Sequence, residues 1–528
     1  MTDTPLQGEA ISPLRRGIIL FTLTSTVALY ALTVTIANVS LPQMQGALSA
    51  TQDQIALVVT FNIVATAVAT PMTGWLTARF GQRRVLLTCV SAFTVATLMC
   101  GLSNSLEMLV FFRVLQGLCG APLAPLSQSI VLASYPQHKH GTATSIFGMG
   151  VVLGPLIAPT IGGYLSEEYS WRWVFFMIVP MCVFSLLGCW AFVADGIRAA
   201  RIRLDWTGFI ALSVAIACFQ LLLDRGERNS WLESPEIVLE ICAAALFFYI
   251  FIVHTFTAEK PFLNPRLFLD RNFVIGMALT LVFGLLNFTP MTLLPGLLQN
   301  LRGYPDGIIG LLLGARGVGT MLGFSILFFG NKYDPRIWLV CGFSLQGLSG
   351  LMMAQIDINL TTWDVASASF LQGLGTGFLW VPLTLVAFNT LSRELFPEGS
   401  SIFHLTRNIG SSAHISISVA LVLHSAKINY GHLSESVTPY AKAWQIPSMA
   451  GGWSMGSVQS LAHISGEVQR QGLMIGYINA FYFYTLTALA ALPLILMVRM
   501  KKADPAPAAN PPTPARSEKP KLQPVKSA

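Results

Sequence analysis

Three arginines lie inside long apolar stretches of this chain, at positions 113, 316 and 407. A cation within membrane hydrocarbon costs at least a few kcal/mol unless it is paired or hydrated. Gln116 lies three residues after Arg113, so the two side chains share a helix face and can form a hydrogen bond. We therefore predict a polar pathway that includes Arg113, Gln116, Arg316 and Arg407. The structural alternative for Arg113 is a side chain that reaches toward a helix end.

Polar side chains also occur near the end of the first apolar stretch. Thr33, Thr35 and Asn38 lie in a segment that is otherwise too apolar for water. Their hydroxyl and amide groups must find hydrogen-bond partners once the helix is surrounded by lipid. We predict that these three residues belong to the same pathway.

Two residues are candidates for carrying a proton. His404 lies three residues before Arg407 on much the same helix face, and histidine titrates near neutral pH. Asp224 lies near the end of another apolar stretch. The structural alternatives are a neutral packing histidine at 404 and a solvated pair of Asp224 with Arg225 at the membrane interface.

Several function classes find no support in the sequence. It has no pairing of a nucleophile with a base, no glycine-rich phosphate loop and no metal-ligand spacing, so neither an enzyme nor a metal or cofactor site is expected. The eight cysteines fall within or at the ends of apolar stretches and form no CxxC pair. The formal charge of +7 comes from basic residues scattered over short loops, which argues against nucleic acid as a partner.

The composition indicates an integral membrane protein made of helices. Of 528 residues, 53% are hydrophobic and only 11% are charged, whereas soluble domains carry about 25% charged residues. Crossing ~30 Å of hydrocarbon takes about 20 apolar residues per helix. We predict about fourteen transmembrane helices, at 17–38, 55–78, 85–103, 107–134, 142–165, 172–194, 206–224, 236–256, 272–297, 306–330, 336–356, 364–391, 401–425 and 473–498.

Lysine and arginine predict the orientation of these helices. Alternate loops are basic, around 79–84, 139, 198–203, 260–271, 332–336, 393 and 499–502. The loops at 39–54, 103–106 and 357–363 contain neither residue. Cytoplasmic loops carry the excess of positive charge, so both termini are expected in the cytoplasm, with residues 1–16 as the N-terminal extension. Most of the chain is therefore expected to lie within the lipid bilayer.

Two segments differ from this pattern. The tail 499–528 is rich in proline, alanine and lysine, and we expect a disordered cytoplasmic extension. Residues 426–472 form a long segment that we interpret as an outer loop, with a helix-like run at 457–471. Loops of this length are usually either functional or disordered.

An internal repeat divides the chain. The tetrapeptide Leu-Gln-Gly-Leu occurs at 115–118 and again at 371–374, and Leu-Pro occurs at 41–42 and 294–295. Two six-helix bundles are therefore predicted, at 17–195 and 272–498, with two inserted helices at 206–256. Ser369 occupies the position in the second repeat that Arg113 occupies in the first, so the charge at this position belongs to one half only.

The segment after the second predicted helix combines glycine with arginine. Gly74 precedes Arg79, Gly81 and Arg83, a pattern that predicts a helix end, a tight turn and a cationic cluster near lipid phosphates. It resembles the loop between the second and third helices of the major facilitator superfamily, which latches one conformation. Ala78 stands where that family has an acid.

The fifth predicted helix carries Gly150, Gly154 and Pro155, which are typical of a kinked helix that packs closely on others. This pattern resembles the antiporter signature of drug exporters in the same superfamily. The resemblance to its fourteen-helix drug:proton antiporter branch continues over the segments 35–39, 171–176, 221–226, 406–408 and 432–437.

The resemblance has several implications. It implies two bundles that rock around a central site, no cofactor, and a proton gradient that drives export of hydrophobic or amphipathic small molecules across a bacterial inner membrane. It implies a periplasmic membrane-fusion adaptor and an outer-membrane channel as partners. It also implies that Arg113 lies beside the pathway and takes part in proton coupling. Thr33 replaces the acid that the family uses, so coupling is expected to involve His404 or Asp224 instead.

Two alternatives remain open at this point. Arginine exceeds acidic residues in the predicted helices, and a buried cation attracts an anion, so the substrate could be an anionic metabolite, siderophore or fatty acid. The other alternative is a membrane sensor or scaffold that transports nothing.

Overall fold

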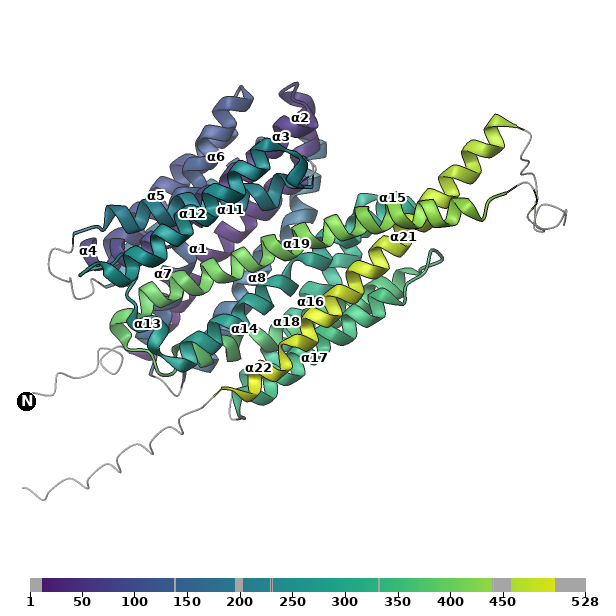
Figure 1. Ribbon diagram of the computed structural model, residues 1–528. Coiled ribbons are helices and arrows are strands. Elements are labelled where there is room, and N and C mark those ends of the chain that lie inside the picture. Colours follow the sequence, from purple (N-terminus) through teal and green to yellow (C-terminus); the bar gives the residue numbers. More distant parts are fainter. Residues whose placement is uncertain are drawn as a thin grey trace, which may run out of the picture. The chain divides into compact units, whose positions relative to one another are not determined.

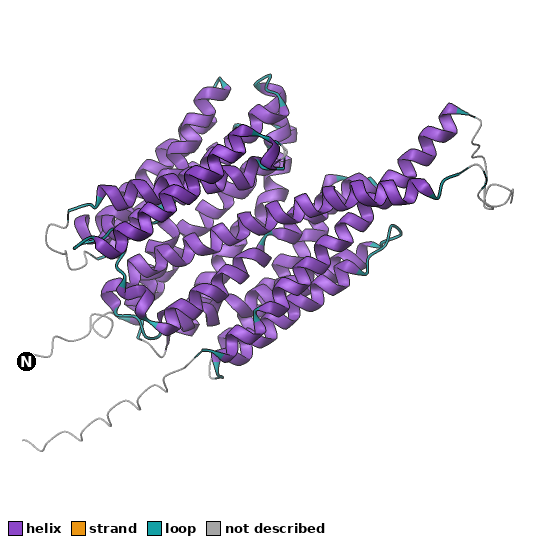
Figure 2. Ribbon diagram, viewed as in Figure 1, coloured by secondary structure: helices purple, strands orange, loops and turns teal. Residues whose placement is uncertain are grey.

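The computed structural model describes residues 12–498 except 137–138, 195–202, 228, 230, 331–332, 439 and 441–456. For residues 38–39, 52–53, 159–160, 167, 306 and 393 it describes the backbone alone. The regular structure of the described residues is helical throughout, as Figure 2 shows. The predicted tail at 499–528 lies outside the described residues.

The first half of the chain contains ten helices within the described residues. They are α1 (Pro13–Val39), α2 (Leu41–Ala47), α3 (Gln52–Ala69), α4 (Met72–Phe80), α5 (Gln82–Gly101), α6 (Leu106–Gly120), α7 (Leu123–Ser134), α8 (His140–Glu168), α9 (Trp173–Phe176) and α10 (Ile178–Phe192).

An inserted pair of helices and the second half follow. The inserted segment contains α11 (Trp206–Arg225), η2 (Trp231–Glu233) and α12 (Pro235–Thr257). The second half contains α13 (Arg266–Leu269), α14 (Arg271–Asn287), α15 (Thr289–Arg302), α16 (Asp306–Gly330), α17 (Pro335–Ala354), α18 (Thr362–Phe388), η3 (Arg393–Leu395), α19 (Phe396–Glu435), α21 (Val458–Ala490) and α22 (Leu492–Leu496).

The number of membrane-crossing helices agrees with the sequence. Within the described residues, thirteen helical segments are long and apolar enough to cross a membrane, and the pair α3–α4, bent by 54°, makes a fourteenth. The sequence prediction of an all-helical membrane protein with about fourteen spans is therefore confirmed.

Each half has its own apolar core, and helices of the two halves also pack together. Phe93, Phe147 and Phe175 are among the fully buried side chains of the first half, and Phe343 and Phe481 are among those of the second. Between the halves, α8 packs against α16 and α18, while α4 and α7 pack against α19. Contact between the halves therefore depends on a few helices.

Within its described residues, the segment 426–472 is largely helical. The prediction of a loop was wrong for 426–435, and the predicted helix-like run at 457–471 is confirmed. Residues 426–435 continue α19, which has 40 residues, and 458–472 begin α21, which has 33. These polar ends stay helical because they pack on each other. The Tyr430 hydroxyl lies 3.1 Å from the Ser465 hydroxyl, and a Cβ at Gly472 would lie 3.1 Å from the Ala426 carbonyl oxygen. Figure 1 shows both helices extending together beyond their neighbours.

Candidate functional site

Arg113 lies in α6 with 1% of its surface exposed. Its Nη1 donates a hydrogen bond to Gln116 Oε1 at 2.7 Å, and its Nε donates to the Val58 carbonyl of α3 at 3.4 Å. Gln116 Nε2 in turn donates to the Thr97 hydroxyl of α5 at 2.8 Å. The structure therefore contains the predicted Arg113–Gln116 contact, and a chain of neutral groups holds it between three helices.

The positive charge of Arg113 has no carboxylate partner among the described residues. The described ion pairs join Arg225 to Glu236 and Glu240, His254 to Asp205, and Arg470 to Glu467. Arg113 Nη2 is buried without a hydrogen-bond partner in the described part of the chain. An incompletely bonded cation in a dry interior is energetically costly, and such groups concentrate where proteins function.

The second half contains a comparable pair, in which the arginine comes from a position other than that of Ser369. Arg316 of α16 donates through Nε to Gln372 Oε1 of α18 at 2.5 Å. Its Nη2 donates to the carbonyl oxygen and to the side-chain oxygen of Asn287, each at 2.8 Å. Its Nη1 lies 2.9 Å from the Met291 sulfur. A half-buried guanidinium therefore lies beside the glutamine of the repeated motif in this half too.

The repeat shows which position supplies the guanidinium of the second half, where Ser369 replaces Arg113. A Cβ at Gly117, next to Gln116, would lie 2.6 Å from the Asn62 carbonyl oxygen, and a Cβ at Gly373 would lie 1.9 Å from that of Arg316. Asn62 and Arg316 thus occupy equivalent places against the repeated motif. The guanidinium comes from α6 in the first half and from α16 in the second. Comparison of residue 62 with residue 316, as well as 113 with 369, would have revealed this exchange.

Arg407 of α19 donates all its described side-chain hydrogen bonds to a single acceptor. It is half-buried, and its Nε and Nη2 donate to Asn408 Oδ1 at 3.3 and 3.0 Å. Its guanidinium carbon lies 5.2 Å from the ring centre of Trp380 in α18.

His404 lies in a contact between the halves. Its Nε2 donates to Gln128 Oε1 of α7 at 2.6 Å, and the Ser400 hydroxyl donates to the same oxygen at 3.4 Å. Gln128 Nε2 donates to the Thr384 hydroxyl of α18 at 3.2 Å. These four side chains are buried. The proton-carrier candidate is thus part of a hydrogen-bonded seam, and it lies 4% exposed.

Asp224 lies at the end of the inserted helix α11. The Thr60 hydroxyl of α3 donates to its carboxylate. One turn earlier, Gln220 Nε2 donates to the Ser412 hydroxyl of α19 at 2.9 Å. Arg225 forms its ion pair with Glu236 of α12, at 2.5 Å, rather than with Asp224. Helix α11 therefore makes hydrogen bonds to both halves.

The predicted residues Thr33 and Thr35 of the first helix form hydrogen bonds within that helix. The Thr33 hydroxyl donates to the Leu29 carbonyl at 2.7 Å, and the Thr35 hydroxyl donates to the Ala31 carbonyl at 3.0 Å. Thr33 is only 1% exposed. The side chain of Asn38 lies outside the described residues. In this conformation Thr33 and Thr35 therefore need no partner beyond their own helix.

The glycine and arginine motif lies where α4, α5 and α19 meet. A Cβ at Gly74 would lie 3.0 Å from Cβ of Glu398, in the first turn of α19. Gly81 joins α4 to α5 with a φ of +87°, which residues with a side chain rarely adopt. Arg79 lies in the last turn of α4, and Arg83 Nη2 donates to the Trp190 carbonyl at 2.6 Å. We call this end of the bundle the basic end.

Helix α8 packs on α1 through its glycines. A Cβ at Gly150 would lie 2.1 Å from Thr24 Cγ2, and one at Gly154 would lie 2.4 Å from the Ala28 carbonyl oxygen. Pro155 follows directly, within a helix that the structure assigns as continuous from His140 to Glu168. Such short separations require glycine, so α1 and α8 form one close-packed pair.

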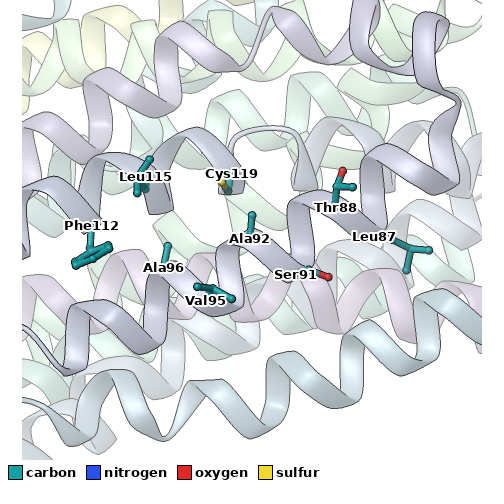
Figure 3. Close-up of a pocket in the computed structure, with 9 residues that line it drawn as sticks. All are labelled: Leu87, Thr88, Ser91, Ala92, Val95, Ala96, Phe112, Leu115 and Cys119. Carbon is teal, nitrogen blue, oxygen red and sulfur yellow. The ribbon is translucent and has the colours of Figure 1, made fainter.

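A groove on the surface between α5 and α6 is separate from these residues. It has a volume of about 570 Å³, and Figure 3 shows its lining side chains. These are Leu87, Thr88, Ser91, Ala92, Val95, Ala96, Phe112, Leu115 and Cys119. None of the predicted pathway residues lines the groove, and its walls carry no charge, so it is typical of a lipid-facing surface.

Comparisons with known proteins agree on one family. The family model described as Major Facilitator Superfamily matches residues 23–413. The Multidrug export protein EmrB of Escherichia coli (strain K12) is 32% identical over 440 residues, which cover 82% of this chain and 85% of that protein. The Fatty acid resistance protein FarB of Neisseria gonorrhoeae is 29% identical over 444 residues, 84% of this chain and 88% of that protein.

The solved structures support the same fold. A structure of the proton:xylose symporter XylE, described as a major facilitator superfamily protein, superposes with a TM-score of 0.60 at 11% sequence identity. The match covers 92% of this chain and 96% of that one. At this identity the likeness concerns the fold alone. Together with the apolar helices, these matches identify a multi-pass membrane protein.

Proposed function

Since this chain belongs to the major facilitator superfamily, we propose that it is a secondary active exporter of hydrophobic and amphipathic small molecules, of the multidrug efflux type. The observation that carries the proposal is its similarity to the Multidrug export protein EmrB, at 32% identity over more than four fifths of both chains. The fold and the family support a transporter rather than an enzyme.

The mechanism that we propose is alternating access between the two halves. Hydrogen bonds between them lie toward the basic end, where Gln128 contacts His404 and Thr384 and where α4 packs on the start of α19. These bonds join neutral side chains, and a neutral hydrogen bond contributes only about 1 kcal/mol net. The basic end can therefore close and reopen at small energetic cost as the halves rock.

The basic end faces the cytoplasm in this proposal. Arginines at 79, 83 and 84 and the basic residues at 260, 266 and 271 lie at one end of the helices, and cytoplasmic loops carry such an excess. Both termini are then cytoplasmic, and the membrane is the bacterial inner membrane. Because the basic end is closed and faces the cytoplasm in this proposal, this conformation is the one that releases substrate to the outside.

A proton gradient is the proposed energy source. The seam around His404 contains neutral groups, so a proton on the imidazole would introduce a charge between the halves and favour their separation. Arg113 and Asp224 are the other coupling candidates. Asp224 accepts a hydrogen bond from Thr60 of the first half, while the neighbouring Gln220 donates to Ser412 of the second.

The proposed partners are a periplasmic membrane-fusion adaptor and an outer-membrane channel. The extended ends of α19 and α21 are the docking candidate for the adaptor. A helix of 40 residues spans about 60 Å, twice the ~30 Å of hydrocarbon, so α19 reaches beyond the membrane on its C-terminal side.

Transport by the purified chain tests the function. In proteoliposomes with an imposed pH gradient, we expect gradient-dependent movement of neutral and amphipathic fluorescent compounds. The Arg113→Ala variant should lose at least about tenfold in rate, equivalent to ~1.4 kcal/mol. Arg302→Ala, a change at the end of α15, is the matched control and should transport normally. If the wild type shows no gradient-dependent transport, the proposal of an exporter is contradicted, and a membrane sensor or scaffold remains as the alternative.

A second candidate is an exporter dedicated to an anionic amphipathic compound. Within the described residues, Arg113, Arg316 and Arg407 have no carboxylate within ion-pairing distance. A pathway with cations and no acids attracts anions and repels cations. The similarity to a protein named for fatty acid resistance supports the same candidate.

A further inference from the structure

The three buried arginines differ in how far their hydrogen-bonding capacity is used. Arg316 donates to three oxygen atoms and contacts one sulfur. Arg113 is 1% exposed, so no ligand reaches it without rearrangement. Arg407 is half-buried and donates to a single oxygen, that of Asn408. Arg407 therefore has both unused donors and an exposed surface.

The unused donors of Arg407 lie on one edge of its guanidinium. Asn408 Oδ1 accepts from Nε and Nη2, so that edge is occupied. Nη1 makes no hydrogen bond within the described part of the chain. The edge formed by Nη1 and Nη2 matches the two oxygens of a carboxylate, which accepts two parallel hydrogen bonds from arginine.

We propose that Arg407 binds the anionic head group of an amphipathic substrate, with Trp380 beneath the guanidinium. This inference rests on the proposed export function and names the subsite that selects the substrate by charge. The substrate class is an organic anion with a carboxylate, or a group of like geometry, on an apolar body.

Trp380 fixes the orientation of the guanidinium. Its ring centre lies 5.2 Å from the guanidinium carbon of Arg407, within the range of a cation–π contact. The indole is 9% exposed, and its Nε1 has no hydrogen-bond partner among the described residues. Trp380 also packs against Phe283 and Phe403, with ring centres 6.0 and 5.8 Å apart. These aromatic surroundings lower the local dielectric and strengthen attraction to an anion.

Binding of a matched pair of probes tests the subsite. The full chain in nanodiscs is titrated with 11-(dansylamino)undecanoate and with its methyl ester, which differ in the carboxylate charge. Energy transfer from tryptophan to the dansyl group reports binding. We expect the wild type to bind the carboxylate at least about tenfold more tightly than the ester. Arg407→Gln should abolish this preference, and Arg407→Lys should retain part of it.

Two further variants separate the subsite from general effects. Arg302→Gln removes an arginine that lies over Tyr304 at the end of α15, and it should keep the full preference. Trp380→Phe keeps an aromatic ring and should weaken carboxylate binding several-fold while ester binding changes little. Melting temperatures of all variants show that each is folded, and Arg407→Lys supplies the result if Arg407→Gln does not fold.

The outcomes distinguish this inference from the proposed function. Equal binding of carboxylate and ester by the wild type, or an unchanged preference in Arg407→Gln, would overturn the subsite. If the same wild-type preparation still drives neutral dyes along a pH gradient, the exporter stands without the subsite. A carboxylate preference that depends on Arg407, with no gradient-driven transport of any probe, would support the subsite and overturn the exporter.

Discussion

The two halves of the molecule place a guanidinium beside the same glutamine in different ways. In the first half, Arg113 and Gln116 lie on one helix, and the arginine is fully buried with one unbonded nitrogen. In the second half, Arg316 reaches Gln372 from a neighbouring helix and bonds Asn287 as well. The repeat therefore preserves the contact while the source of the charge changes.

This difference indicates different roles. Arg316, whose donors are satisfied, links three helical segments and stabilises their packing. A cation with an unused donor in a dry interior stores unfavourable energy, which a change of conformation or of protonation can relieve. We infer that Arg316 holds the second half together and that Arg113 takes part in transport. The predictions below separate these roles.

Arg316→Ala should have the largest effect on stability. The change leaves Gln372 Oε1 and both Asn287 oxygens without their donor, and each buried acceptor left unpaired costs roughly 1–3 kcal/mol. Release of a desolvated charge offsets part of this cost, so we expect a net loss of about 2–4 kcal/mol in unfolding free energy. Unfolding of the purified protein in detergent measures it. Arg302→Ala is the control, and an equal loss there would refute the role of Arg316.

Replacement of the repeated glycines tests whether the two halves share one packing arrangement. A Cβ at Gly373 would lie 1.9 Å from a backbone oxygen, and one at Gly117 would lie 2.6 Å from the equivalent oxygen. We expect each alanine variant to lose about 1–3 kcal/mol of stability, with the larger loss at 373. Gly314→Ala is the control because no atom lies within 4 Å of its Cβ position. Unchanged melting of both variants would contradict the shared packing.

Gln128→Ala should weaken the closed basic end. It removes the partner of His404, Ser400 and Thr384, and the loss is expected to be about 1 kcal/mol, or roughly a fivefold increase in the open population. Hydrogen–deuterium exchange of 123–134 and 396–405 should rise accordingly. Ser129→Ala changes a hydroxyl bonded within the same helix and is the control. If hydrogen–deuterium exchange in Gln128→Ala equals that of the wild type, the hydrogen bonds of Gln128 do not hold the basic end closed.

The sequence predicted the parts of this comparison that depend on local patterns. Apolar run lengths predicted the helices, and the spacing of Arg113 and Gln116 predicted their contact, because residues three apart share a helix face. The contact of Arg316 with Gln372 joins residues 56 positions apart, so no local spacing indicates it. The repeat indicated which helices are equivalent. It did not show that the guanidinium of the second half comes from Arg316, which is equivalent to residue 62 and not to residue 113.

The extended helices α19 and α21 show a second limit. Polar composition after residue 425 predicts that the membrane-spanning part of the helix ends there, but it does not show whether the helix itself continues. The structure shows that the helix continues because Tyr430 and Ser465, along with Gly472, pack the two polar ends together. Contacts between segments far apart in the sequence thus determine those parts of the fold and of the site that local patterns do not predict.

The unequal roles of the two arginines are tested most directly by Arg113→Lys and Arg316→Lys measured side by side. Lysine keeps the charge but cannot reproduce the planar set of donors that both sites use. Melting temperature and transport per folded molecule in proteoliposomes are recorded for each variant. We predict that Arg113→Lys keeps its melting temperature and loses transport at least about tenfold. We predict that Arg316→Lys melts at a lower temperature while its folded molecules transport normally. The reverse assignment, or equal effects in both variants, would contradict the account.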